Sequence, residues 1–307
     1  MNSDKVPEKS SIIKKSIAII PAYNEELAIG SVVLRTVPFV SQVVVIDDGS
    51  QDHTVEIAQL AGAVVIKHEK NLGYGAALQT IFTIAQEMDS DEFVILDADG
   101  QHNPSDIPKL LAALRSGADI AIGSRFLTEK SSVPHYRKIG IKILDRATNF
   151  AGKISISDSQ SGFRAYSRTA IEKLTIQADG MAAGSEILIR AGHLGLVIAE
   201  VPINTKYDIP NISSSNPLVH GITVLSNIVG LISYRRPLIS FGIPGFIVMV
   251  IGVYLAFWVL SLYTTYKVFP YTMTVVCGVC LMLGLMLINT ALILNSVMQL
   301  TIKSRNK

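Results

Sequence analysis

Short apolar runs alternate with amphipathic stretches along the first part of the chain. The runs are Ile17–Ile20, Val43–Ile46, Val64–Ile66, Phe93–Leu96 and Ile120–Ile122. The amphipathic stretches, which lie between several of these runs, are Glu25–Val37, Thr54–Ala61, Gly75–Met88 and Pro104–Arg115. Strands and helices that alternate over short connections are typical of a doubly wound, mostly parallel sheet. The pattern therefore predicts an α/β domain whose ligands bind beyond the carboxyl ends of the strands.

Two long segments without a charged residue follow near the end of the chain. They span Leu238–Leu262 and Met273–Leu300, and each is longer than the roughly 20 residues that a helix needs to cross a hydrocarbon core. The loop between them, 263–272, carries tyrosines and Phe269, which suit a membrane interface. The sequence predicts a hairpin of two transmembrane helices.

Basic residues predict how this hairpin is oriented. The loop between the two segments carries only Lys267, whereas several basic residues lie just outside them. These are Arg235, Arg236, Lys303, Arg305 and Lys307. Because cytoplasmic flanks carry the excess of Lys and Arg, we expect a multi-pass cell-membrane protein with both termini and the amino-terminal domain in the cytoplasm. Residues 1–15 are charged and lack a long apolar core, so no cleaved signal peptide is expected.

Composition supports a membrane protein and argues against one class of partner. The chain of 307 residues is 49% hydrophobic and 17% charged, and its mean hydropathy of +0.39 is high for a soluble protein. The net charge of +2 gives no reason to expect a nucleic-acid partner. Cys277 and Cys280 have the spacing of a redox or zinc half-site, but they lie inside the second predicted span, where packing of small residues is the favoured interpretation.

The segment FVILDADGQHNP places two aspartates directly after an apolar run. In an extended backbone the side chains of Asp97, Asp99 and Gln101 point the same way. Two like charges at the end of a buried strand repel each other unless a cation compensates them, and oxygen ligands suit a hard cation. The alternative is a solvated loop in which Asn103 and Pro104 begin the next helix.

Two other predicted strands also end in polar segments, PAYNEE at 21–26 and DDGSQDHT at 47–54. Asn24, Ser50 and Asp52 are good helix caps, but caps do not need an adjacent acidic pair such as Asp47 and Asp48. The segments suggest a pocket that binds ribose or base on one side and a metal-bound diphosphate on the other. The dinucleotide and P-loop glycine motifs are absent. The glycines of NLGYGAAL serve close packing of a helix start or direct phosphate contact.

These segments together resemble a known family. The ordered set PAYNEE, DDGSQDHT, NLGYGAA, DADGQH, GSR (123–125) and SGFRAYSR (161–168) is similar to family-two glycosyltransferases of the GT-A (Rossmann-like) fold. The chain resembles most closely the dolichyl-phosphate mannose synthases and related polyprenyl-phosphate glycosyltransferases. The resemblance covers about residues 16–210. It implies an inverting transfer from a GDP- or UDP-linked sugar to dolichyl or polyprenyl phosphate, with Mg²⁺ or Mn²⁺.

The resemblance also implies roles for individual residues. Nucleotide-sugar binding is expected of Pro21, Tyr23, Glu25, Asp48, Asp97, Arg125 and Arg164. Metal binding is expected of Asp97, Asp99 and Gln101. The catalytic residues are expected to be Asp99, Arg125 and Arg137, since the planar guanidinium of arginine suits phosphate oxygens.

The acceptor and the sugar leave alternatives open. A polyprenyl phosphate is already an anionic nucleophile, whereas a sugar hydroxyl needs a general base, for which Glu186 is the candidate. One alternative function is therefore transfer to a sugar hydroxyl in polysaccharide or glycolipid synthesis. Another is a non-catalytic, membrane-tethered protein that binds sugar nucleotides. The transferred sugar is left open between mannose, glucose and N-acetylglucosamine.

The predicted organisation has five parts. They are a tail at 1–15, a cytoplasmic catalytic domain at 16–210, an interfacial segment at 211–237, the transmembrane helices within 238–300, and a basic cytoplasmic tail at 301–307. Pro217–Ser233 is either an amphipathic interfacial helix that guides the lipid or an ordinary packed segment. Ser132–Phe150 is basic and helix-like, and it forms either a wall that faces phosphate or a solvated helix face.

Overall fold

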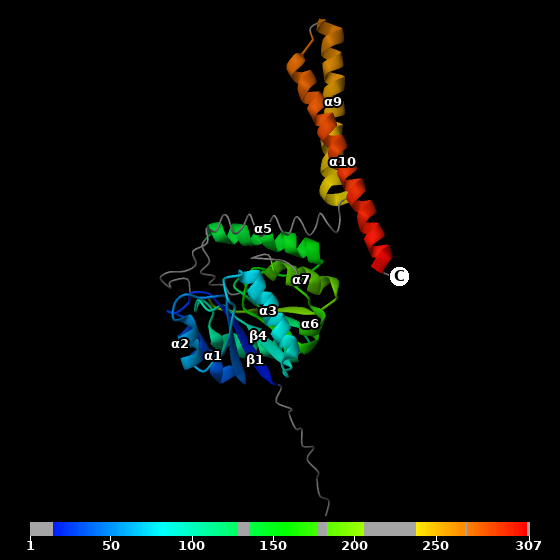
Figure 1. Ribbon diagram of the computed structural model, residues 1–307. Helices are drawn as coiled ribbons and strands as arrows, with labels where there is room; N and C mark the ends of the chain where they lie inside the picture. Colours follow the sequence, from blue (N-terminus) through cyan, green and yellow to red (C-terminus); the bar gives the residue numbers. More distant parts are fainter. Residues whose placement is uncertain (1–14, 128–134, 177–182, 206–237, 268, 306–307) are drawn as a thin grey trace, which may run out of the picture. The chain divides into compact units, whose positions relative to one another are not determined.

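The chain folds into two compact units, Met1–Leu225 and Ser226–Lys307, which are described separately (Figure 1). The computed structural model describes residues 15–127, 135–176, 183–205, 238–267 and 269–305. Residues 1–14 of the predicted amino-terminal tail and the interfacial segment 211–237 with Arg235 and Arg236 lie outside these residues. The side chains of the predicted basic tail also lie outside the description.

A mixed sheet forms the centre of the first unit. The described strands have the order β3-β2-β1-β4-β6-β5-β7. Their bounds are β1 Ser16–Ala22, β2 Gln42–Asp47, β3 Val64–Lys67, β4 Glu92–Ile95, β5 Ile120–Ser124, β6 Arg164–Ser167 and β7 Ile198–Pro202. Strand β6 runs antiparallel to β4 and β5, and the other pairings are parallel. The predicted doubly wound, mostly parallel α/β sheet is confirmed.

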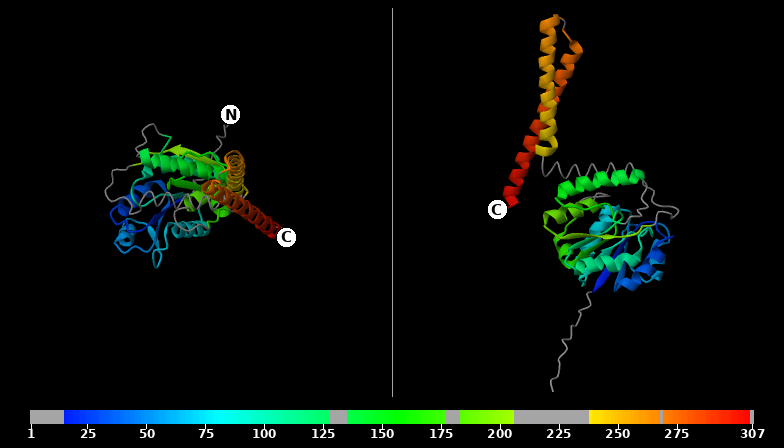
Figure 2. Two further views of the ribbon diagram at one scale, coloured as in Figure 1. Left: turned by 90° about the horizontal axis from the view of Figure 1, so that it is seen from above. Right: turned by 180° about the vertical axis from the view of Figure 1, so that it is seen from behind.

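Helices cover both faces of this sheet (Figures 1 and 2). Their bounds are α1 Ile29–Thr36, α2 Thr54–Leu60, α3 Tyr74–Glu87, α4 Ile107–Arg115, α5 His135–Gly152, α6 Arg168–Lys173 and α7 Ala183–His193, with the short 3-10 helices η1 Val37–Phe39 and η2 Pro104–Asp106. Ile17 and Ile19 of β1 pack with α3, α6 and α7 on one face. Ala18 and Ile20 pack with α1, α2 and α4 on the other. Burial on both faces explains why the strand reads as a continuous apolar run.

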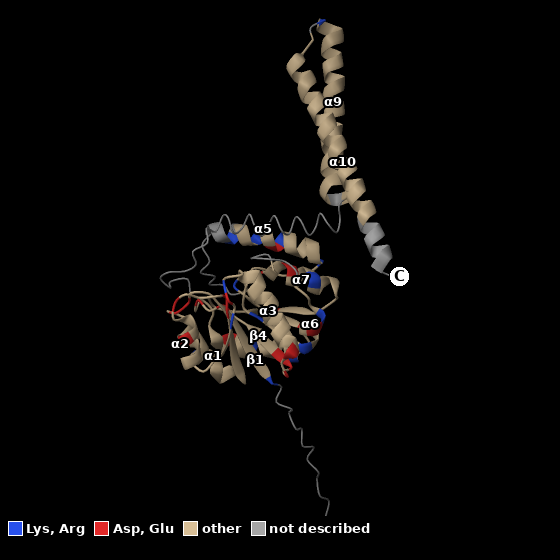
Figure 3. Ribbon diagram, viewed as in Figure 1, with Lys and Arg blue, Asp and Glu red and all other residues tan. Residues whose placement is uncertain are grey.

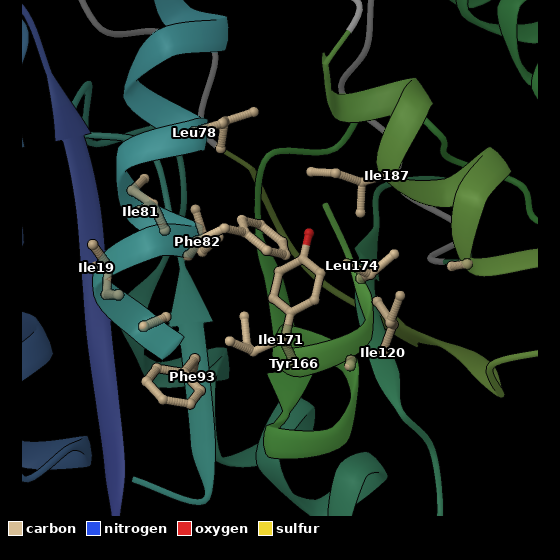
Figure 4. Packing of buried hydrophobic residues seen from close by; sticks show 14 of the residues in the cluster. Ile19, Leu78, Ile81, Phe82, Phe93, Ile120, Tyr166, Ile171, Leu174 and Ile187 are labelled. Carbon is tan, nitrogen blue, oxygen red and sulfur yellow. The ribbon is translucent and has the colours of Figure 1, made fainter. Parts of the chain in front are cut away.

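Tyr166 of β6 stands at the centre of one core layer (Figure 4). Its side chain is 1% exposed, and its ring meets Phe82 of α3 edge to face, with centroids 5.3 Å apart. This geometry is the favourable one for two aromatic rings. The contact fixes β6, and therefore the loop that precedes it, against α3.

The second unit is a helical hairpin. It comprises a π-helical turn, η4 (Leu238–Gly242), and the helices α9 (Ile243–Tyr266) and α10 (Tyr271–Arg305). Within them, Ser240–Tyr266 and Tyr271–Val297 are long and apolar enough to cross a membrane, with mean hydropathies of 2.4 and 2.3, and Figure 3 shows the described part of both helices in tan, the colour of residues other than Lys, Arg, Asp and Glu. The first helix ends later than its predicted end at Leu262. It continues through Tyr266, and Lys267 ends it in a left-handed conformation.

Small residues bring the two helices of the hairpin together. A side chain on Gly245 would collide with Leu287 and the backbone of Gly284, and one on Gly252 would collide with Leu281. Cys277 is buried, and its thiol donates to the Gly252 carbonyl oxygen over 3.3 Å. The interpretation of the cysteine pair as packing residues fits this contact.

Candidate active site

A cavity of about 540 Å³ opens at the carboxyl edge of the parallel strands. It is lined by the end of β1, by residues that follow β1, β2 and β4, by the start of α3, by the loop before β6 and by the start of α7. Seven residues predicted from the sequence line this cavity: Pro21, Tyr23, Glu25, Asp48, Asp97, Asp99 and Arg164. Gln101 and Arg125 are not among the lining residues, and the side chain of Arg137 lies outside the description.

The two loops after β1 and β2 are joined by hydrogen bonds. The backbone N–H of Asn24 donates to Ser50 Oγ over 2.9 Å, and Asn24 Oδ1 accepts from the Gln51 N–H over 2.9 Å. The Glu25 N–H donates to Thr54 Oγ1 over 2.7 Å. These bonds hold the segment after β1 in a turn, so α1 begins at Ile29 and not at Glu25 as predicted. The polar residues considered as helix caps instead position Tyr23 and Glu25 at the cavity.

Asp48 is held at the cavity by partners from the segment between β3 and α3, which no local sequence pattern indicates. Its carboxylate accepts from the backbone N–H groups of Leu72 and Gly73 over 2.9 and 2.8 Å. His68 Nδ1 lies 2.8 Å from the same carboxylate, and His68 Nε2 lies 2.9 Å from Thr80 Oγ1. Both oxygens of Asp48 are therefore already fixed in orientation. The adjacent Asp47 is fully buried and accepts from the Ser50 N–H instead.

The segment after β4 differs from its predicted geometry. The strand ends at Ile95, and residues 98–100 form a turn in which Gly100 has a φ of +73°. The Gln101 N–H bonds to Asp99 Oδ1 over 2.9 Å. The expectation that alternation along an extended strand aligns Asp97, Asp99 and Gln101 is wrong, because a turn positions them. The turn nevertheless places Asp97 and Asp99 at the same cavity.

The carboxyl groups at the cavity have displaced pKa values. Burial, and then the charges of Asp99, Asp97 and Asp52, raise the pKa of Glu25 to about 7. Burial and the charge of Asp97 raise the pKa of Asp99. Burial also acts to raise the pKa of Asp97, but the His102 hydrogen bond and the charges of His102, Arg125 and Arg164 outweigh it and lower that pKa. The ionised carboxylates repel one another, and a cation between them would relieve that repulsion.

The donor set fits Mg²⁺ or Mn²⁺. Asp97 and Asp99 supply hard carboxylate oxygens, and within the described ranges no three His, Cys, Asp or Glu side chains gather as a closed metal cage. Mg²⁺ is usually bound by one or two carboxylates together with substrate phosphates and water. Two carboxylates beside an open cavity match that pattern. Gly162 contributes space here, because a Cβ at this position would overlap the Asp97 carboxylate.

Arg125 forms a buried ion pair. Its Nε and Nη2 lie 2.7 and 2.6 Å from the two oxygens of Asp158, and its backbone N–H also donates to Asp158. The Asp158 side chain is fully buried and that of Arg125 is 14% exposed. The guanidinium therefore fixes the loop before β6, and a role in phosphate binding stays a prediction.

Arg164 holds the same loop from β6. Its three nitrogens donate to the carbonyl oxygens of Ser161, Gly184 and Ser159, each over 2.8 Å. It is 4% exposed. Arg164 lines the cavity, and its hydrogen bonds join the loop to the start of α7.

Two further buried carboxyl groups flank the cavity. Asp145 of α5 accepts from the Ser159 N–H over 2.7 Å, and burial raises its pKa to about 6. Glu186 of α7 is 2% exposed and accepts from Arg190 Nε over 2.6 Å. Glu186 does not line the cavity, although the sequence analysis named it as the candidate base for a hydroxyl acceptor.

Comparisons with known proteins agree with this geometry. The profile of Glycosyl transferase family 2 matches residues 17–175. An uncharacterized protein of Methanocaldococcus jannaschii is 36% identical over 218 residues, which cover 69% of this chain and 89% of that protein. The UDP-N-acetylglucosamine–dolichyl-phosphate N-acetylglucosaminyltransferase of Methanococcus voltae is 36% identical over 62% of this chain and 84% of its own. The polyprenol monophosphomannose synthase of Mycolicibacterium smegmatis is 34% identical over 62% of this chain and 77% of its own.

Solved structures show the same fold. Glucosyl-3-phosphoglycerate synthase of Mycobacterium tuberculosis in complex with UDP superposes with a TM-score of 0.58, at 24% identity, over 71% of this chain and 80% of that one. The same enzyme with Mn²⁺, UDP and glucosyl-3-phosphoglycerate gives a TM-score of 0.57 at 22% identity. At these identities the likeness is one of fold alone.

Proposed function

The chain belongs to glycosyl transferase family 2, and from that premise we propose that it transfers a hexose or N-acetylhexosamine from a nucleotide diphosphate sugar to a polyprenyl phosphate. The observation that carries the proposal is that Asp97 and Asp99 line one cavity, whereas the candidate base Glu186 is buried and does not line it. Relatives named for dolichyl-phosphate and polyprenol acceptors, and two helices able to cross a membrane, support the lipid acceptor.

In this proposal the residues after β1 and β2 bind the nucleotide. Tyr23 is 42% exposed at the cavity, and Asp48 is oriented by two backbone N–H groups and His68. Such prior orientation reduces the entropy lost on binding. The proposal covers both GDP and UDP, since a carboxylate such as that of Asp48 accepts a hydrogen bond from an N–H or hydroxyl of either nucleotide.

Asp97 and Asp99 hold the divalent cation in the proposal, together with Gln101. A bound Mg²⁺ or Mn²⁺ supplies positive charge that stabilises a departing diphosphate. His102 Nε2, 3.3 Å from Asp97 Oδ2, keeps that carboxylate turned toward the cavity. The buried His102 ring packs on Phe163 with centroids 5.2 Å apart, which fixes its position.

The position of the candidate base supports a phosphate acceptor, because within the described residues Glu186 of α7 does not line the cavity. Glu186 is buried in an ion pair with Arg190, and a base must come within about 3 Å of the proton that it removes. A phosphate acceptor has no such proton to lose at neutral pH. We assign Arg125 and Arg137 to the acceptor side, where guanidinium groups bind phosphate oxygens.

The proposed setting is a membrane with the donor on its cytoplasmic side. The helices α9 and α10 anchor the chain, and the basic residues at the outer ends of the hairpin favour cytoplasmic termini. The catalytic unit then meets nucleotide sugars in the cytoplasm and the lipid phosphate at the membrane surface.

A comparison of two lipid acceptors tests the proposal. The full chain in vesicles is given radiolabelled UDP-glucose, UDP-N-acetylglucosamine or GDP-mannose with Mn²⁺, and either polyprenyl phosphate or the matching polyprenol. We expect label in the lipid fraction with the phosphate and none with the alcohol. Equal transfer to polyprenol, or transfer only to sugar hydroxyls, would show that the acceptor is wrong.

A further inference from the structure

One wall of the cavity is neutral and rich in hydrogen-bonding groups. It consists of Ser159, Gln160 and Ser161 from the loop before β6, and Gly184 and Ser185 from the start of α7. Gln160 Nε2 donates to Ser159 Oγ over 2.8 Å and to Ser185 Oγ over 3.0 Å. These two bonds use the amide N–H groups and leave the Gln160 carbonyl oxygen as an acceptor at the cavity.

The strand order places this wall beside the metal-binding carboxylates. Strands β2 and β1 are followed by β4, which precedes Asp97 and Asp99, and β4 is followed by β6. Because β6 is antiparallel, the loop before it lies at the same edge as the ends of the parallel strands. A substrate with its nucleotide over β2 and β1 and its diphosphate at β4 therefore extends its sugar to the loop that contains Gln160.

The loop meets the metal site directly and is held firmly. A Cβ on Gly162 would overlap the Asp97 carboxylate, so the two segments are in contact. Asp145 accepts from the Ser159 N–H, and the Glu200 carboxylate accepts from the Ser157 N–H over 2.9 Å. Arg164 binds the carbonyl oxygens of Ser159 and Ser161. Groups held in this way are oriented before the substrate binds, which is what discrimination between similar ligands requires.

We infer that Gln160 is a specificity-determining residue that accepts a hydrogen bond from a hydroxyl or amide N–H of a neutral donor sugar. This inference rests on the proposed function and names the sugar class of that same site. A site built to bond a substrate N–H or O–H rejects analogues that lack it, because its own polar group is then left unpaired.

The charges around the cavity favour a neutral sugar over a uronic acid. Glu25, Asp48, Asp97 and Asp99 line the cavity, and Arg164 is the one Lys or Arg among the described lining residues. Its three nitrogens already donate to backbone carbonyl oxygens. A sugar carboxylate at this wall would lose its hydration without gaining a dedicated cation, which is unfavourable.

The test compares Gln160→Leu with wild type and with Gln59→Leu, a matched change at an exposed position of α2. With the full chain and Mn²⁺, titration calorimetry gives the Kd of the bare nucleotide and of its sugar conjugate, for UDP with UDP-glucose and UDP-N-acetylglucosamine and for GDP with GDP-mannose. For the preferred pair we expect Gln160→Leu to leave the Kd of the nucleotide within about twofold and to weaken the sugar nucleotide about tenfold. Gln59→Leu should change neither.

An equal loss for nucleotide and sugar nucleotide would show that Gln160 only supports the loop, and no change in either would also overturn the inference. A second comparison uses a sugar and its uronate on the same nucleotide, such as UDP-glucose and UDP-glucuronate or GDP-mannose and GDP-mannuronate. Tighter binding of the uronate would contradict the assignment to a neutral sugar.

Because these are binding measurements, their outcome is independent of transfer to polyprenyl phosphate. A shifted Kd ratio without such transfer refutes the proposed acceptor alone, and transfer with an unshifted ratio refutes the role of Gln160 alone.

Discussion

Asp145 is a buried carboxyl group that costs stability at neutral pH. Burial and then the charge of Asp158 raise its pKa from 3.8 to about 6, against the hydrogen bond from Ser159 and the charge of Arg125. At a pH between the unfolded and folded pKa values, the folded chain holds a proton that the unfolded chain releases. Stability therefore falls as the pH rises from about 4 to about 6. A rise of this size corresponds to roughly 2–3 kcal/mol at pH 7.

We therefore expect Asp145→Asn to stabilise the first unit at pH 7 and to have little effect at pH 4. Asn keeps an oxygen that can accept from the Ser159 N–H and has no proton to lose. Urea unfolding of the full chain in detergent at both pH values measures the difference. Asp89→Asn, at a fully exposed side chain, is the control. A destabilised Asp145→Asn at pH 7 would show that the ionised carboxylate is needed for its Ser159 contact.

The positions of site residues were predictable from sequence where the residues follow a strand end, and not where they depend on a distant partner. Tyr23, Asp48 and Asp97 could be placed at one edge because parallel strands end there. The pairing of Asp48 with His68 spans 20 residues and that of Arg125 with Asp158 spans 33. No local pattern links such residues. The turn at Gly100 was missed because Asp97 and Asp99 read equally well as the end of a strand.

Among the elements, the first five strands along the chain were predictable and β6 and β7 were not. Strands β1, β2, β4 and β5 have the apolar runs that burial on both faces requires, and β3 at the edge of the sheet has an apolar run although it is only partly buried. Strand β6, RAYS, is four residues long and carries Arg164, and β7, IAEVP, carries Glu200. Each of these strands is short and interrupted by a charged residue, so its sequence gives a weak strand signal, and sheet neighbours decide its conformation. Gln160, which precedes β6, was missed for the same reason.

The hairpin of α9 and α10 makes a prediction at the scale of elements. A side chain on Gly284 would meet Met249 and the Gly245 carbonyl oxygen, whereas one on Gly278 would meet nothing within 4 Å. We expect Gly284→Leu to force the helices apart and destabilise the hairpin by about 1–3 kcal/mol. Thermal unfolding in detergent, followed by the fluorescence of Trp258 in α9, measures this. Gly278→Leu is the matched control, and equal effects of the two changes would contradict the observed packing.

We propose that both termini of the chain lie in the cytoplasm, because basic residues flank the outer ends of the hairpin. Thr265 lies near the end of α9, and position 304 lies beyond the second span. In a background of Cys277→Ser and Cys280→Ser, we expect a membrane-impermeant thiol reagent to label Thr265→Cys on intact cells. We expect it to label Ser304→Cys only after permeabilisation. The reverse pattern would invert the topology and move the catalytic unit away from cytoplasmic nucleotide sugars.

The most direct test of the central claim compares Asp99→Asn with Glu186→Gln in sugar transfer to polyprenyl phosphate. Asp99 faces the cavity with Asp97, whereas Glu186 is buried against Arg190. Because Gln retains an acceptor for Arg190, the second change preserves that contact. With Mn²⁺ present, we expect Asp99→Asn to lose at least about 100-fold in rate and Glu186→Gln to keep a substantial fraction of wild-type activity. An inactive Glu186→Gln beside an active Asp99→Asn would contradict the account, since it would indicate a carboxylate base acting on a hydroxyl acceptor.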